Sequence, residues 1–96
     1  MRVYLGLDAA ALDRLAAGEP VLAEQFVPAS EDEEDELAAL EVAAEHGEVA
    51  VAAEVDAEDD PVLLARVAAF HVDLDGSGHL AWYAADEIVA VRALLS

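Results

Sequence analysis

The sequence predicts an α+β fold (mixed α/β): a four- to five-stranded mixed sheet with three helices mainly on one face. Short segments that alternate apolar and polar residues, typical of strands, are interspersed with segments whose apolar residues recur every three or four positions, typical of helices. Along the chain these segments follow the order β-α-(β)-α-β-β-β-α. A chain of 96 residues is long enough for one hydrophobic core, so we expect residues 1–96 to form a single domain.

The first elements are a strand and a short helix. Residues 2–7 alternate in the manner of a strand with one buried face. Asp8 follows at a position suited to an N-cap, and the helix after it should end at Gly18. Residues 21–27 fit either a short strand or an irregular connector, and the strand is favoured.

The most acidic part of the chain predicts the longest helix, over residues 30–46. Ser30 and Glu33 have the spacing of a capping box, and the acidic run after Ser30 suits the positive end of the helix dipole. Gly47 is placed to end the helix. The expected buried stripe consists of Leu37, Leu40 and Ala44.

The second half of the chain predicts a central strand, a hairpin and a last helix. Residues 48–55 are apolar at nearly every position, as in a strand that is buried on both faces. Residues 64–74 and the strand that contains Trp82 and Tyr83 should pair across the DGSG sequence. The two aromatic side chains then point to opposite faces, and burial of both is favoured. The alternative is that one of them forms an exposed aromatic patch at a partner site. A helix over residues 84–95 completes the chain.

The charge balance restricts the partners. The chain has 22 acidic residues, four arginines and no lysine, so its formal net charge is −18. Such a surface repels nucleic acid and anionic membranes, and it attracts cations and basic proteins. No apolar run reaches the length of a membrane span, which predicts a cytoplasmic protein. Cysteine is absent, so there is no disulfide and no thiolate metal site.

Residues 73–84, DLDGSGHLAWYA, resemble a calcium-binding loop of the EF-hand type. Asp73, Asp75 and Ser77 occupy the first, third and fifth positions, where such a loop has oxygen ligands. The twelfth position, which should carry a bidentate glutamate, is Ala84. Because Asp-Gly and Ser-Gly are also turn sequences, a plain hairpin turn is the favoured interpretation. A cation site at Asp73, Asp75 and Ser77 is the alternative.

The sequence favours a binding function over catalysis. It has no glycine-rich phosphate loop, no nucleophile elbow and no zinc-protease motif, so we expect no enzymatic activity and no cofactor. The histidines are interpreted as exposed or core-edge side chains. The leading hypothesis is a non-catalytic protein-interaction or regulatory module, whose partner is a basic protein or a second copy bound through the open face of the sheet. The alternative is a weak divalent-cation (calcium) binder that uses residues 73–84.

Three stretches of the chain resemble a family of small, uncharacterised actinobacterial proteins that share a domain of unknown function. They are MRVYLGLDAAALDRLAAGE, EDEEDELAALEVAAE followed by EVAVAAEV, and VAAFHVDLDGSGHLAWYAADEI. The chain departs from the family in having a shorter segment between HVD and WYA, which supports the turn interpretation of DGSG. The resemblance implies a fold and carries no activity.

Overall fold

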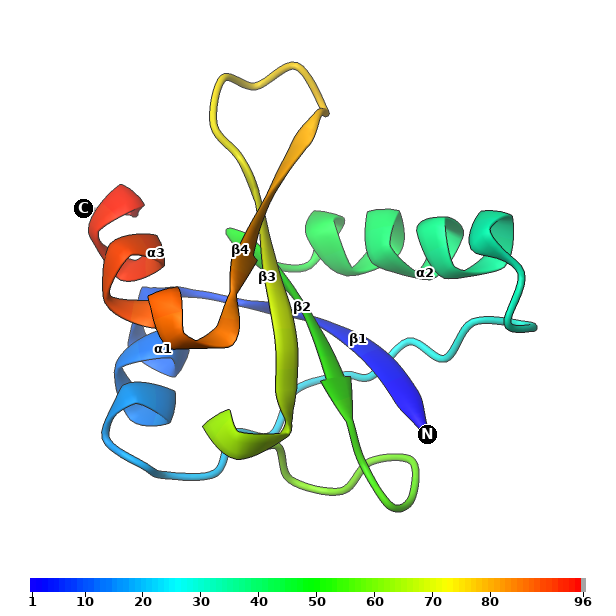
Figure 1. Cartoon of the computed structure of the whole chain (residues 1–96), viewed down its shortest axis with the longest axis horizontal. Helices are drawn as coiled ribbons and strands as arrows, with labels where there is room; N and C mark the ends of the chain where they lie inside the picture. Colours follow the sequence, from blue (N-terminus) through cyan, green and yellow to red (C-terminus); the bar gives the residue numbers. More distant parts are fainter. Residues whose placement is uncertain (96) are drawn as a thin grey trace.

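The structure is a computed structural model, and it describes residues 1–95 (Figure 1). Its strands are β1 (Arg2–Leu7), β2 (Val49–Glu54), β3 (Val67–Asp73) and β4 (Leu80–Ala84). Its α-helices are α1 (Ala9–Ala16), α2 (Glu33–Glu45) and α3 (Ile88–Leu94), with short 3₁₀ turns at Leu64–Arg66 and Ala85–Glu87. The predicted α+β class is therefore confirmed. Within residues 1–95, no helix has the length and apolarity needed to cross a membrane.

The four strands form one antiparallel sheet in the order β1-β2-β3-β4. The expectation of a mixed sheet is wrong in this respect, since every strand pair of the described residues is antiparallel. The segment 21–27 forms no regular strand. It makes only two isolated bridges, Val21 with Val62 and Phe26 with Tyr4. Pro20 and Pro28 bracket this segment and lack the N–H groups that would extend its pairing.

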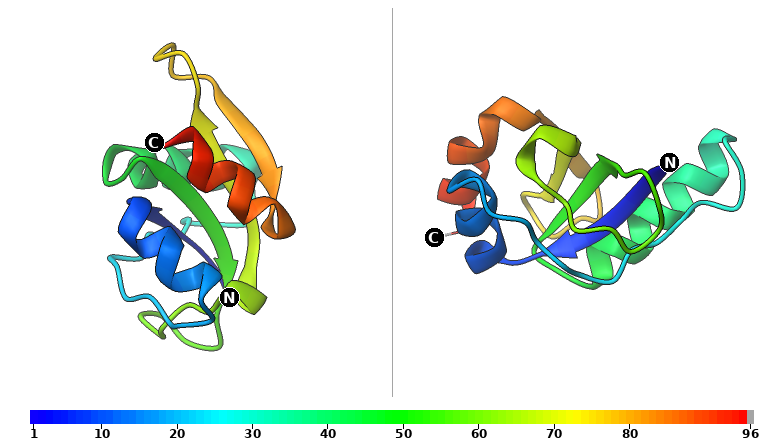
Figure 2. Two further views of the ribbon diagram at one scale, coloured as in Figure 1. Left: turned by 90° about the vertical axis from the view of Figure 1, so that its left-hand side faces the viewer. Right: turned by 90° about the horizontal axis from the view of Figure 1, so that it is seen from below.

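The helices lie on both faces of the sheet, as Figures 1 and 2 show. On one face, α1 and α3 cover the main core, whose largest fully buried side chain is Phe70. On the other face, α2 packs over β1 and β2, and the second, smaller core contains Tyr4, Ala50 and Ala52. The prediction that all three helices lie mainly on one face is therefore wrong for α2. Because α2 covers these three residues, this half of the face needs no second copy to bury it.

The close packing of α2 on the sheet depends on small residues. The helix buries Ala39 and Ala43 most deeply. Of the predicted stripe, Leu40 and Ala44 are partly buried against this core, whereas Leu37 is 52% exposed, so the prediction is wrong for Leu37. Beneath its C-terminal end lies Gly6 of β1, where a Cβ atom would come within 2.6 Å of the carbonyl carbon of His46 and 2.8 Å of the nitrogen of Gly47. Next to Gly6, where the helix approaches the strand this closely, only a small side chain such as that of Ala43 fits between them.

One predicted helix cap is confirmed and the other is wrong. The carboxylate of Asp8 accepts a hydrogen bond from the N–H of Ala11 at 2.9 Å and caps α1. The N-cap of α2 is Asp32 and not Ser30, and its side chain makes no capping bond. The Ser30 hydroxyl instead donates to the carboxylate of Asp35, so the expected capping box does not form.

Candidate functional site

A groove lies between α2 and the β3–β4 half of the sheet, because α2 packs on β1 and β2 only. It consists of two adjoining hollows of about 290 and 380 Å³, which share Leu37, Leu40 and His71. Its α2 side carries Glu33, Glu36, Leu37, Leu40 and Glu41. Its sheet side carries Ala69 and His71 of β3 and Leu80 and Trp82 of β4. We call this feature the α2–β4 groove.

The strand register places Trp82 on the same face as α2. Trp82 of β4 pairs with His71 of β3, and His71 pairs with Ala50 of β2. Ala50 in turn pairs with Gly6 of β1, which lies beneath the helix. Directly opposed residues of antiparallel strands share a face. The Trp82 side chain is 62% exposed, so the expectation that it is buried is wrong. Tyr83 points to the other face and packs against the main core, as expected.

Negative charge borders the apolar part of the groove. The hydroxyl of Tyr4 donates to the carboxylate of Glu36 at 3.4 Å. Burial, and next the charge of Glu36, raise the pKa of Tyr4 above its ordinary value, so this hydroxyl stays protonated. Burial lowers the pKa of His71, so the imidazole on the floor of the groove is neutral near pH 7. The helix α2 itself carries acidic residues, among them Glu33, and no basic one.

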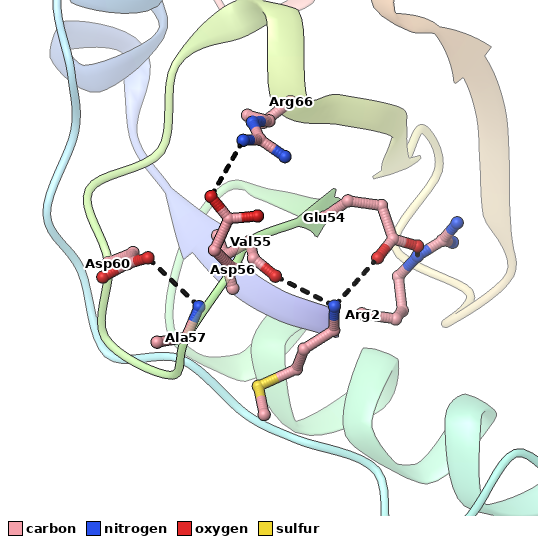
Figure 3. Close-up of polar contacts among 8 residues, drawn as sticks. Arg2, Glu54, Val55, Asp56, Ala57, Asp60 and Arg66 are labelled. Atoms are coloured by element: carbon pink, nitrogen blue, oxygen red, sulfur yellow. Dashed lines mark hydrogen bonds and ion pairs between the residues drawn. The ribbon is translucent and has the colours of Figure 1, made fainter.

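The arginine at one end of the groove is paired, as the close-up in Figure 3 shows. The Nε of Arg2 donates to Oε1 of Glu54 at 2.8 Å, and this bond is the main cause that raises the pKa of Arg2 and lowers that of Glu54. The Met1 amino group donates to the carbonyl of Val55 at 2.9 Å and lies 3.5 Å from Oε2 of Glu54. The charge of Arg2 is thus matched by a carboxylate outside the groove. Both side chains of the pair are partly exposed, so its contribution to stability is small.

The sequence DGSG forms the loop of the β3–β4 hairpin, as predicted. This loop stands out from the body of the molecule (Figure 1). Oδ1 of Asp73 accepts hydrogen bonds from the N–H of Gly76 at 2.8 Å and of Asp75 at 3.3 Å, and Oδ2 accepts from Gly78 at 2.9 Å. Gly76 and Gly78 have φ angles of 76° and 86°, which favour glycine. The turn therefore accounts for both the aspartate and the glycines.

The other two predicted cation ligands also bond within the loop. Oδ1 of Asp75 accepts from the N–H of Ser77 at 3.1 Å, and hydrogen bonding to Ser77 lowers the pKa of Asp75. The Ser77 hydroxyl oxygen accepts from the N–H of His79 at 3.2 Å. Across residues 1–95, no three His, Cys, Asp or Glu side chains are grouped as a metal site would need. Calcium binding by Asp73, Asp75 and Ser77 stays the alternative hypothesis, which a calcium titration tests.

No protein-family model, curated protein or solved structure matches this chain. The resemblance to an actinobacterial family of unknown function therefore also stays a prediction.

Proposed function

We propose that this chain is a cytoplasmic, non-catalytic protein-interaction module and that the α2–β4 groove is its contact surface. The observation that carries the proposal is the pair of large apolar side chains on the two sides of this groove. Leu37 of α2 is 52% exposed and Trp82 of β4 is 62% exposed. Exposed apolar surface rimmed by polar residues is typical of sites that bind other proteins.

The chemistry of these side chains supports a binding role. Tryptophan is enriched among the residues that dominate binding energy at protein interfaces, because it buries a large area in a rigid side chain. Trp82 is the single tryptophan of the chain, which otherwise has two phenylalanines and two tyrosines. Phe70, Tyr4 and Tyr83 contribute to the two cores, so the largest aromatic side chain is the one that is left for contact with a partner.

The experiment that tests this proposal uses peptides selected from a random library against the immobilised chain. Because Trp82 is the single tryptophan, its fluorescence reports directly on occupation of the groove. We expect selected peptides to shift its emission. Trp82→Ala and Leu37→Ala should each weaken binding of a labelled peptide by about tenfold or more, as for central interface residues.

The matched control is Val89→Ala. Val89 is 77% exposed on α3, on the opposite face of the sheet, so its truncation removes exposed apolar surface away from the groove. The Val89→Ala variant should bind the selected peptides with the same affinity as the wild-type chain. Selected peptides that bind Trp82→Ala and Leu37→Ala as tightly as wild type would refute the groove as the contact surface. Far-UV circular dichroism of each variant checks that the fold is retained.

A further inference from the structure

We propose that the partner presents an extended segment bearing lysine or arginine, which adds to β4 as a fifth, antiparallel strand. One cationic side chain of this segment lies in the α2–β4 groove beside Trp82. The inference rests on the proposed function and specifies the chemistry and the binding mode of the partner. Four features of the molecule support it: the edge of the sheet, the direction of its N–H groups, its charge and the position of Trp82.

The sheet has one edge that is paired and one that is not. At the outer edge of β1, Tyr4 and Phe26 exchange two backbone hydrogen bonds, of 2.9 and 2.7 Å. Within residues 1–95, no strand or isolated bridge pairs with the outer edge of β4. An unpaired strand edge is a template for a further strand, and many peptide-binding proteins use it in this way.

The backbone of β4 directs hydrogen-bonding groups toward this edge. The N–H of Ala84 donates to the carboxylate of Glu87 at 2.9 Å, so it points away from β3. Successive peptide groups of a strand alternate in direction, so the N–H groups of Trp82 and Leu80 also point outward. Within residues 1–95, these two donors have no backbone partner beyond β4. A fifth strand would satisfy them.

The charge around β4 determines which strand is accepted. Asp73 and Asp75 lie at one end of β4 and Asp86 and Glu87 at the other. A second copy paired antiparallel about Trp82 would bring the acidic ends of the two strands together, between molecules that each carry a net charge of −18. A basic segment meets opposite charge at both ends of this edge. Charge complementarity therefore favours a cationic partner over self-association.

The register then places a cationic side chain over Trp82. In an antiparallel fifth strand, the residue opposite Trp82 lies on the same face, which is the α2 face. A lysine or arginine there could contact the indole ring, a favourable cation–π arrangement. Glu33 and Glu36 line the same hollow as Trp82 and would face the positive group. Arg2 also lines this hollow, but its charge is paired with Glu54, so the groove offers an aromatic surface and two carboxylates to one cation.

The test uses a synthetic nine-residue peptide of alternating valine and lysine, acetylated and amidated at its ends. Binding to the full chain is measured by calorimetry at about 0.15 M KCl, where diffuse attraction is screened beyond roughly 8 Å. A peptide of the same composition in scrambled order controls for the remaining non-specific attraction. We expect the alternating peptide to bind at one-to-one stoichiometry and more tightly than the scrambled one.

Backbone methylation distinguishes strand addition from simple charge attraction. A lysine opposite Trp82 has its N–H directed at β4, whereas the neighbouring valines direct theirs outward. Methylating the lysine nitrogens should therefore weaken binding by about tenfold or more, because several hydrogen bonds are lost. Methylating the valine nitrogens should leave the affinity unchanged. The two peptides carry the same side chains and the same charge, so they form a matched pair.

Two sets of variants test the protein side. Leu80→Pro removes one outward donor and should weaken binding about three- to tenfold, whereas Leu80→Ala, which keeps that donor, should weaken it less. Replacing Glu33 and Glu36 together by glutamine should weaken binding about three- to tenfold. The matched control replaces Glu19 and Glu48 by glutamine, with the same change in net charge outside the groove.

The outcomes separate this inference from the proposed function. If the lysine peptide binds through Trp82 but both methylated peptides bind equally, strand addition is wrong and the groove remains the contact surface. If glutamate-containing or neutral peptides bind through Trp82 more tightly than lysine peptides, the cationic partner is wrong. A dimer that sedimentation detects and Leu80→Pro dissociates would replace the basic segment with a second copy. If no bound peptide is affected by Trp82→Ala, the proposed function itself fails.

Discussion

Replacing Gly6 by alanine should displace α2 from the sheet. The added Cβ atom would lie 2.6 Å from the carbonyl carbon of His46 and 2.8 Å from the nitrogen of Gly47, and closer still to the carbonyl oxygen of Ala43. All three are backbone atoms, so no side-chain rotation relieves the overlap. The helix must move outward by several tenths of an ångström, and this opens the small core that Tyr4 and Ala43 share.

The expected loss in the free energy of unfolding is about 3 kcal/mol or more, at the upper end of the range for overpacked sites. This is a large part of the roughly 5–15 kcal/mol that stabilises a domain. Urea denaturation followed by far-UV circular dichroism measures it. With a slope of about 1–3 kcal/mol per molar urea, the midpoint should fall by about 1–3 M.

The control for this prediction is Gly76→Ala. A Cβ atom at Gly76 meets nothing within 4 Å, but the φ angle of 76° is unfavourable for alanine. Its cost should be about 1–2 kcal/mol, from backbone conformation alone. A Gly6→Ala chain as stable as Gly76→Ala, or more stable, would refute the close approach of α2 to β1. Because α2 carries Glu36 and Leu37, Gly6→Ala should also weaken peptide binding in the groove.

Three further predictions concern the EF-hand-like loop, a helix cap and the half-buried His71. Calorimetry at about physiological ionic strength should show no saturable one-to-one calcium site, because Ala84 supplies no ligand at the twelfth position of the loop. A saturable site that Asp73→Ala abolishes would contradict this prediction. Asp8→Ala removes the cap of α1 and should lower the free energy of unfolding by about 1 kcal/mol, measured by thermal denaturation. Ser30→Ala removes no cap of α2 and should change this free energy by less than about 0.5 kcal/mol. Burial lowers the pKa of His71 in the folded state, so as pH falls below the ordinary value of 6.5 the unfolded chain is protonated first and the free energy of unfolding declines. Urea denaturation at several pH values should show a smaller decline for the His71→Gln variant. An equal decline in both chains would contradict the prediction.

Local signals in the sequence were sufficient for most of the secondary structure. The alternation in β1, the N-cap at Asp8 and the two-faced apolar pattern of β2 depend on neighbours within a few residues, and all three predictions are confirmed. The DGSG hairpin also depends on neighbours within a few residues, because the hydrogen bonds that form its turn lie within the loop itself. The failure of the Ser30 capping box shows the limit of such signals, since another residue, Asp32, starts the helix.

The candidate site itself was decided by tertiary structure. Helical periodicity identified an apolar stripe through Leu37 on α2, but the close approach at Gly6 selected the alanine face that includes Ala39 for burial. Once α2 lies over β1 and β2, the strand order leaves β4 at an open edge with Trp82 uncovered. Sequence alone determined most of the helices and strands, because those preferences are local; the segment 21–27 is the exception. Which apolar side chains remain exposed depended on which surfaces fit together, and this is a property of the packed chain.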